Sequence, residues 1–181
     1  MAGFDEIVGE SAQGEFPSKF LSVSGFVIGE TTLSEIAEKT QGFVYSAPTQ
    51  SGRISYICAK SWKGGTEIFF ESGAMGGWSI LTSITFTPPG YFRDRKCHET
   101  KEALSGSLNG LKINSESSNV IEIIGHSPTY QTKSRLEITM ESPVVIVVDG
   151  IEQRGAKNSG FIGIISNSTI KAFSIYSIES F

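Results

Sequence analysis

The stretch Gly25-Phe26-Val27-Ile28-Gly29 returns in altered form as Gly110-Leu111-Lys112-Ile113-Asn114, nearly half a chain length later. In both places a polar stretch follows and closes on a glycine, Gly42 in the first half and Gly125 in the second. Strand-like segments come after each glycine. The pattern predicts an α+β protein with two tandem repeats, each a short helical segment packed on an antiparallel β-meander.

Each repeat opens with a helix signal. Thr32-Leu33-Ser34-Glu35 has the spacing of a capping box, in which the hydroxyl and the carboxylate satisfy backbone amides at the start of a helix. This predicts a helix over 32–41, with Gly42 as its left-handed cap. Asn119-Val120-Ile121-Glu122 is a weaker version and predicts a helix over 119–124 that ends at Gly125.

The rest of each half is rich in β-branched and aromatic residues, which favour strands. Asp149-Gly150 is a strong signal for a two-residue hairpin turn, and Pro88-Pro89-Gly90 ends the first half because proline donates no ladder hydrogen bond. The strands are expected at 53–61, 66–71, 78–86, 134–141, 144–148, 161–165 and 170–178.

These signals divide the chain into four parts. A weakly ordered leader is expected over 1–20, a first repeat over 21–90, a linker with a short helix over 91–109, and a second repeat over 110–181.

The order and spacing of these residues resemble the tandem units of the β-lactamase inhibitor protein fold, which small bacterial outer-membrane assembly lipoproteins share. In that family the paired sheets form a concave surface that grips a protein partner, and its members work outside the cytoplasm. No inhibitory loop of the family can be matched residue by residue. The residues that carry the resemblance are Gly25-Phe26-Val27-Ile28-Gly29, Glu35-Ile36, Gly42, Gly110-Leu111-Lys112-Ile113-Asn114, Asn119-Val120, Gly125 and Pro128.

Charge and composition argue against two classes of partner. The 181 residues carry a net charge of −4 with a pI near 5.3, whereas nucleic-acid binding usually needs a clustered basic face. The one basic cluster, Arg93-Asp94-Arg95-Lys96, is interrupted by an acid and is interpreted as a solvated linker. The longest apolar run, Val144–Val148, is far shorter than the ~18 residues of a membrane helix. Neither nucleic acid nor a transmembrane segment is expected.

The cellular setting depends on weaker signals. Met1-Ala2-Gly3-Phe4 lacks the pattern of a signal peptide. The expected localisation is periplasmic or secreted, with the signal peptide absent from this sequence, and the alternative is cytoplasmic. The two cysteines, Cys58 and Cys97, permit a disulfide that would contribute about 4 kcal/mol in the chain-entropy model. Two separate buried thiols remain the alternative.

Catalytic and metal-binding patterns are weak. Cys97-His98 with His126 suggests a small cysteine- and histidine-dependent hydrolase, although sequence neighbours usually point apart. Together with Cys58 these residues could supply four zinc ligands, but the close pairs of structural zinc sites are missing. Glu67 and Glu71 lie four apart in an expected strand, hence on one face, where a solvent-facing pair is commoner than acid/base chemistry. No metal, cofactor or catalytic residue is predicted.

Aromatic residues give the preferred site. Tyr and Trp supply much of the binding energy at protein interfaces. We therefore expect a non-enzymatic protein that binds a protein partner through a sheet surface, of the inhibitor, immunity or envelope-assembly type. The alternatives are the hydrolase and a carrier that encloses an apolar ligand between sheet and helices. The candidate partner-binding residues are Tyr56, Trp62, Trp78, Tyr91 and Phe92.

Overall fold

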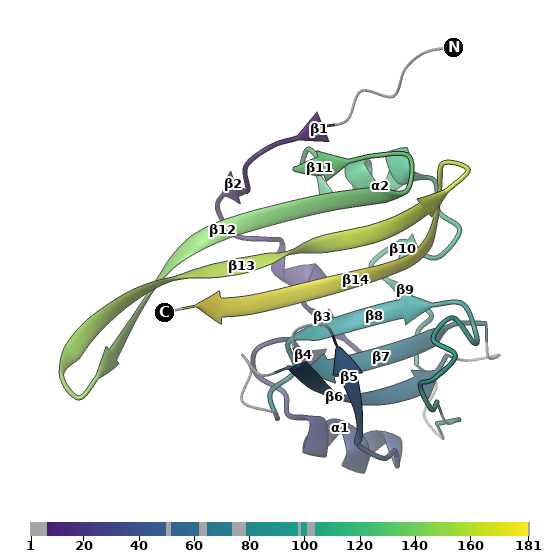
Figure 1. Cartoon of the computed structure of the whole chain (residues 1–181), viewed down its shortest axis with the longest axis horizontal. Coiled ribbons are helices and arrows are strands. Elements are labelled where there is room, and N and C mark those ends of the chain that lie inside the picture. The colour runs from purple at the N-terminus through teal and green to yellow at the C-terminus, as the bar shows by residue number, and fades with distance from the viewer. Residues whose placement is uncertain are drawn as a thin grey trace.

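The computed structural model describes residues 7–49, 52–61, 65–73, 79–97, 99–100 and 104–180. The described part of the chain is mostly β, with 53% of its residues in strands and 12% in helices. One 10-stranded sheet runs through the molecule (Figure 1), and two small hairpins lie beside it.

The helices are short. They are η1 (Ser18–Phe20), α1 (Leu33–Thr40) and α2 (Ser117–Ile124). The strands of the large sheet are β1 (Ile7–Val8), β2 (Ala12–Gln13), β5 (Tyr45–Thr49), β6 (Gly52–Lys60), β7 (Glu67–Ser72), β8 (Ser83–Thr87), β11 (Tyr130–Gln131), β12 (Arg135–Val148), β13 (Ile151–Ser166) and β14 (Thr169–Ser180). The hairpins are β3 (Ser22–Val23) with β4 (Phe26–Val27), and β9 (Ser107–Leu108) with β10 (Leu111–Lys112).

The order of the large sheet is β1-β11-β12-β13-β14-β8-β7-β6-β5, and β2 lies parallel to β12. Two antiparallel meanders, β6-β7-β8 and β12-β13-β14, therefore meet where β14 pairs with β8. In that pairing Phe173 lies opposite Phe86 and Ile175 opposite Ile84. Strands from both halves of the chain share one sheet.

The expected fold class, an α+β protein of two helix-plus-meander repeats, is wrong. Strands dominate, and each α-helix has only 8 residues, against 14 in β12 and 16 in β13. The physical reason is the free edge that each meander would leave at its last strand. These two edges pair with each other, so the halves share a sheet where two separate units were expected.

The first helix forms as predicted. Glu35 N–H donates to Thr32 Oγ1 at 3.3 Å, and Thr32 N–H donates to Glu35 Oε2 at 2.7 Å, which completes the capping box. The backbone N–H and hydroxyl of Thr32 hold the pKa of the Glu35 carboxyl below its ordinary value. The left-handed cap is Gln41, with φ 55°, one residue before the expected Gly42.

The second helix begins earlier than its sequence signal. Its N-cap is Glu116, whose side chain makes no capping hydrogen bond, and Asn119 lies inside the helix. The predicted end is confirmed, because Gly125 adopts φ 79° at the C-cap. The short helix expected after Glu99 includes residues 101–103, which lie outside the described residues.

The strands of the second half are longer than predicted. Segments 134–141 and 144–148 form the single strand β12, which passes through Pro143. Beyond Glu141, β12 has no further register partner in the described chain on the side away from β13, so a missing N–H is tolerated there. The Asp149-Gly150 turn is confirmed, with φ 52° and 80° as a primed hairpin turn requires.

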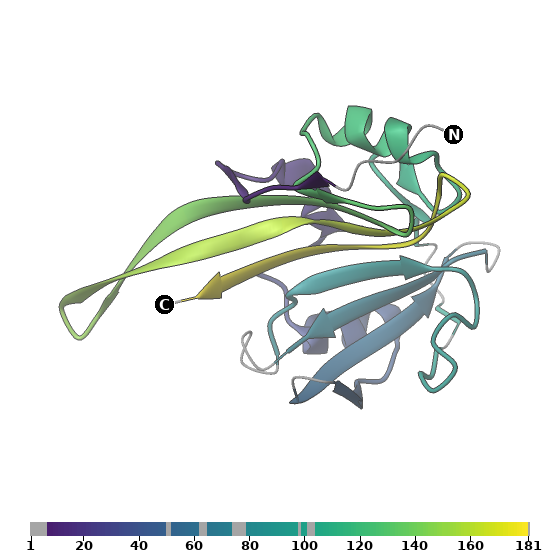
Figure 2. The same cartoon turned by 45° about the horizontal axis from the view of Figure 1, so that its top comes forward.

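The main hydrophobic core lies between one face of the sheet and the helices with the small hairpins. Figure 2 shows the arrangement of these elements. Ile36 and Leu33 of α1 and Val120 and Ile124 of α2 belong to the same core. The chain before β3 contributes as well. Within the expected leader, Phe16 and Phe20 are buried in this core. In the described part of the chain, no helix has the length and apolarity needed to cross a bilayer.

We expect the Gly160→Ala variant to lower the free energy of unfolding by about 2 kcal/mol, because an added Cβ at this buried position in β13 would lie 2.4 Å from the carbonyl oxygen of Ile138. Gly65→Ala is the matched control, since its Cβ would meet nothing within 4 Å. Urea unfolding of both variants measures the difference. Equal stability of the two would contradict the close strand packing at Gly160.

Candidate binding site on the outer face of the sheet

The face of the sheet turned away from the helices, here called the outer face, is defined by strand alternation. Ile68, Phe70 and Phe86 enter the main core, so Phe69 and Thr85 point to the opposite side. Phe69 belongs to a second, smaller hydrophobic cluster with Tyr56 and Cys58. The outer face therefore has a covering of its own in the first half of the chain.

That covering is the segment 88–97, here called the clamp loop. The predicted pairing of Cys58 with Cys97 is confirmed: the two residues form a disulfide with their Cα atoms 4.7 Å apart. Cys58 lies in β6 and Cys97 ends the loop. The covalent bond fixes the end of the clamp loop to the sheet.

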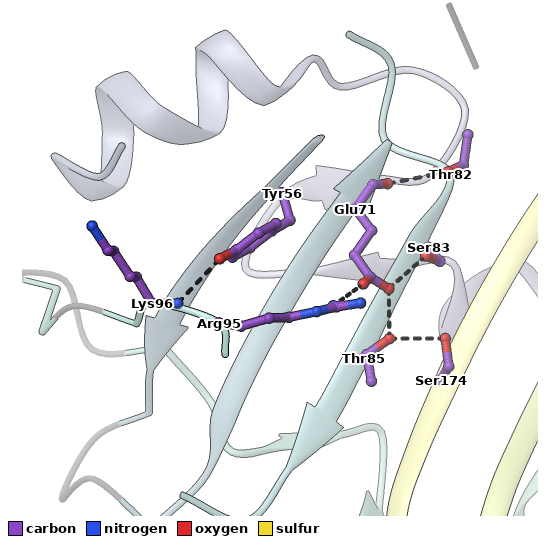
Figure 3. A network of polar contacts seen from close by, with 8 residues as sticks. All are labelled: Tyr56, Glu71, Thr82, Ser83, Thr85, Arg95, Lys96 and Ser174. Atoms are coloured by element: carbon purple, nitrogen blue, oxygen red, sulfur yellow. Dashed lines mark hydrogen bonds and ion pairs between the residues drawn. The ribbon is translucent and has the colours of Figure 1, made fainter. Parts of the chain in front are cut away.

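Arg95 fixes the middle of the loop (Figure 3). Its guanidinium forms an ion pair with the Glu71 carboxylate of β7, and the two side chains are only 17% and 15% exposed. Glu71 also accepts hydrogen bonds from Ser83 at 3.1 Å and Thr85 at 2.9 Å. The Thr85 hydroxyl is in turn hydrogen-bonded to Ser174 of β14 at 3.1 Å. The network therefore reaches across the pairing of β8 with β14.

Aromatic rings surround the same guanidinium. Its central carbon lies 4.2 Å from the ring centre of Phe92, 5.4 Å from that of Tyr56 and 5.5 Å from that of Phe69. These are distances at which a cation is attracted to an aromatic face. The interpretation of residues 93–96 as a solvated linker is therefore wrong for Arg95, because a planar guanidinium can stack on rings and pair with a carboxylate at once.

Backbone amides complete the attachment. Gly90 N–H donates to Glu67 Oε2 at 3.0 Å, and Lys96 N–H donates to the Tyr56 hydroxyl at 3.1 Å. Glu67 and Glu71 do share a face of β7, as expected. Each carboxylate is engaged in holding the clamp loop, so the pair serves its anchoring.

A shallow apolar depression of about 250 Å³ lies beside the loop. Tyr91 and Phe92 form one wall, with their rings at 5.1 Å in an edge-to-face arrangement. Tyr91 is 43% exposed and Ile164, on the facing strand, is 38% exposed. The complete lining is Thr85, Tyr91, Phe92, Ile162, Ile164, Ala172, Phe173 and Ser174.

Tyr176 lies on the outer face near the centre of the sheet. The Tyr176 hydroxyl is hydrogen-bonded to the Thr139 hydroxyl at 3.1 Å. Burial raises the pKa of Tyr176, and the Thr139 hydrogen bond opposes this shift. The phenol therefore stays neutral across the physiological pH range.

The structure brings three of the predicted site residues together at the clamp loop, since the rings of Tyr56 and Phe92 both contact Arg95 and the ring of Tyr91 contacts that of Phe92. Tyr56 is 3% exposed and lies beneath the clamp loop, so it supports the site without presenting a surface. Trp62 and Trp78 lie outside the described residues. Sequence reasoning missed Arg95 and Ile164, although the clustering of Arg95 with aromatic neighbours in sequence is a signal that favours stacking.

The catalytic and metal interpretations meet one obstacle. Cys97 is bonded to Cys58, so neither sulfur is a free thiol. His98 lies outside the described residues, and His126 follows the end of α2. In the described part of the chain, Cys58, Glu67 and Cys97 form the one group of three potential metal ligands, with ligand atoms within 4.8 Å of one another. The disulfide already occupies two of the three.

Comparisons with protein-family models, with curated proteins and with solved structures found no match to this chain.

We expect Arg95→Ala to lower the free energy of unfolding by about 2 kcal/mol. Without Arg95 the Glu71 carboxylate would remain poorly solvated and would lack its cation. Breaking a fully buried ion pair destabilises a protein by ~3–5 kcal/mol. The expected loss is smaller here because both side chains keep some contact with solvent. Arg93→Ala, an exposed position in the same loop, should change it by less than about 0.5 kcal/mol. Chemical denaturation measures both variants, and equal effects would refute the anchoring role of Arg95.

Proposed function

We propose that this protein binds a protein partner through the outer face of its sheet, at the surface formed by Tyr91, Phe92 and Ile164. The binding is steric and makes or breaks no covalent bond. The protein belongs in this proposal to the inhibitor, immunity or envelope-assembly type.

One observation carries the proposal: an exposed aromatic residue is presented by a loop that is already fixed. Binding costs free energy when loops and side chains must be ordered, and a preorganised surface avoids much of this cost. The disulfide, the Arg95–Glu71 ion pair and the Gly90–Glu67 hydrogen bond order the clamp loop in advance. Tyr91 is thereby held beside an apolar depression, which is how interface anchors are commonly arranged.

The size of the depression favours a protein side chain as its occupant. Small-molecule pockets usually enclose about 300–1,000 Å³, whereas this depression holds about 250 Å³ and is open to solvent. An apolar carrier would have to surround most of its ligand. A shallow depression with an aromatic wall suits one or two side chains of a partner.

The hydrolase alternative needs a thiolate, because the thiolate is the nucleophile in cysteine chemistry. Cys97 is held in the disulfide with Cys58. The same covalent bond serves the binding proposal directly, since it fixes the loop that carries Tyr91. Binding is therefore the function that the geometry supports best.

The proposed setting is periplasmic or secreted. The Cys58–Cys97 disulfide is weakly consistent with an oxidising compartment, where such bonds persist.

The test captures partners from envelope and culture-fluid fractions of the source organism with immobilised protein, and then measures the affinity of the captured partner. Tyr91→Ala should weaken binding about 30-fold, which corresponds to the ~2 kcal/mol of an interface anchor. Phe43→Ala is the matched control, because Phe43 is an exposed aromatic residue that follows α1 and is not part of the depression.

Both variants must first melt like the parent protein, so that lost binding is not lost folding. A captured partner whose affinity is unchanged by Tyr91→Ala, or is weakened equally by Phe43→Ala, would contradict the proposed surface.

A further inference from the structure

A second surface lies far from the clamp loop, where β12 and β13 extend beyond the rest of the sheet. Their pairing continues to Val148 opposite Ile151, whereas the last pair of β13 with β14 is Ala156 with Ser180. Residues 144–155, here called the arm, thus pair only with each other in the described chain. Figure 1 shows the arm projecting past the end of β14.

The arm exposes aliphatic side chains. Val147 is 66% exposed and Ile151 is 67% exposed, and Val145 and Val148 are exposed as well. The register of β12 with β13 puts Val145 and Val147 on one face of this ribbon and Val148 and Ile151 on the other. A two-stranded ribbon is marginally stable by itself, and soluble proteins rarely leave a long, apolar strand edge unprotected. The arm therefore has the properties of a surface that another molecule covers.

The charged residues of the arm indicate which class of molecule can bind it. Asp149 lies in the turn at the tip and Glu152 follows it on β13. Carboxylates at the tip are repelled by anionic lipid headgroups and by nucleic-acid phosphates. Another protein surface is the occupant that fits an apolar ribbon with an acidic tip.

The open edge of β13 is complementary to itself. Glu152 and Arg154 lie two residues apart, so they share one face of the strand on either side of Gln153. When a second copy of the segment 151–155 lies antiparallel to the first and is centred on Gln153, Glu152 faces Arg154 of the second copy, and Arg154 faces its Glu152. Opposite charges placed directly across antiparallel strands stabilise the pair.

The same register suits the remaining positions. Ile151 falls opposite Gly155 of the second copy, which leaves room for its side chain, and the two Gln153 amides can hydrogen-bond to each other. The β12 edge is less suited, because Pro143 at the base of the arm has no N–H to donate to a new ladder. The edge of β13 from Ile151 to Gly155 contains no proline.

We propose that two copies of this chain associate through their arms, by antiparallel pairing of the β13 edges over residues 151–155. The two arms then form a four-stranded sheet about a two-fold axis at Gln153. The inference is independent of the proposed function, because the arm residues are not part of the depression beside Tyr91.

The test uses charge reversal with sedimentation velocity and light scattering on the full chain. The unmodified protein should be a dimer at micromolar concentration. Glu152→Arg alone and Arg154→Glu alone each place like charges opposite one another twice, and each should weaken self-association about tenfold or more. An equimolar mixture of the two variants restores both opposite-charge pairs, so it should form a heterodimer with affinity close to that of the unmodified protein.

Lys133→Glu is the matched control for Arg154→Glu: it makes the same change in net charge at an exposed position next to the start of β12, outside the arm, and should leave the dimer intact. A monomeric unmodified protein at 100 µM or so would overturn the proposal. A dimer indifferent to both reversals, or a mixture that fails to restore association, would overturn it equally. Thermal melting of each variant separates lost association from lost folding.

Discussion

The antiparallel pairing of β8 with β14 holds the two halves of the chain together and places the residues of both faces of the sheet. It joins two meanders that are far apart in sequence into one sheet. The contacts across this pairing are apolar on one face of the sheet and polar on the other. On the core side the rings of Phe86 and Phe173 stack with their centres 4.6 Å apart. On the outer side Thr85 and Ser174 are hydrogen-bonded, and the depression beside Tyr91 spans strands from both halves.

We propose that the outer face binds a partner because the clamp loop that carries Tyr91 is held in place by contacts of different kinds. A disulfide resists separation of the chain, an ion pair with surrounding rings orients the loop, and amide hydrogen bonds set its backbone. Arg95 supplies both parts of the second contact, since its guanidinium meets the Glu71 carboxylate and the ring of Phe92 together. Stacking and ion pairing use different directions of a planar cation, which a lysine ammonium could not reproduce.

Local signals in the sequence predicted local structure well. Thr32 and Glu35 specify the start of α1 through neighbours three residues away, and Asp149-Gly150 specifies a turn through the conformations that those two residues tolerate. The pairing of β8 with β14 could not be predicted from local signals. Alternation of apolar and polar residues indicates that a segment is a strand, but it does not indicate which other strand it pairs with. The position of Arg95 depends on that same sheet, so one residue of a charge run interpreted as solvated is a partly buried anchor. Tyr91 and Phe92 were predicted as partner-binding residues from their aromatic side chains near the junction of the two halves, and the structure places both in the wall of the depression.

Amide hydrogen exchange followed by NMR measures whether the clamp loop is rigid before any partner binds. In the oxidised protein the Gly90 and Lys96 amides donate to Glu67 and Tyr56, so we expect protection of about 100-fold or more over an open loop, equivalent to roughly 3 kcal/mol for local opening. Reduction of the Cys58–Cys97 bond should lower that protection while the amides of β7 stay protected. Exchange of both loop amides at open-loop rates in the oxidised protein would contradict the account.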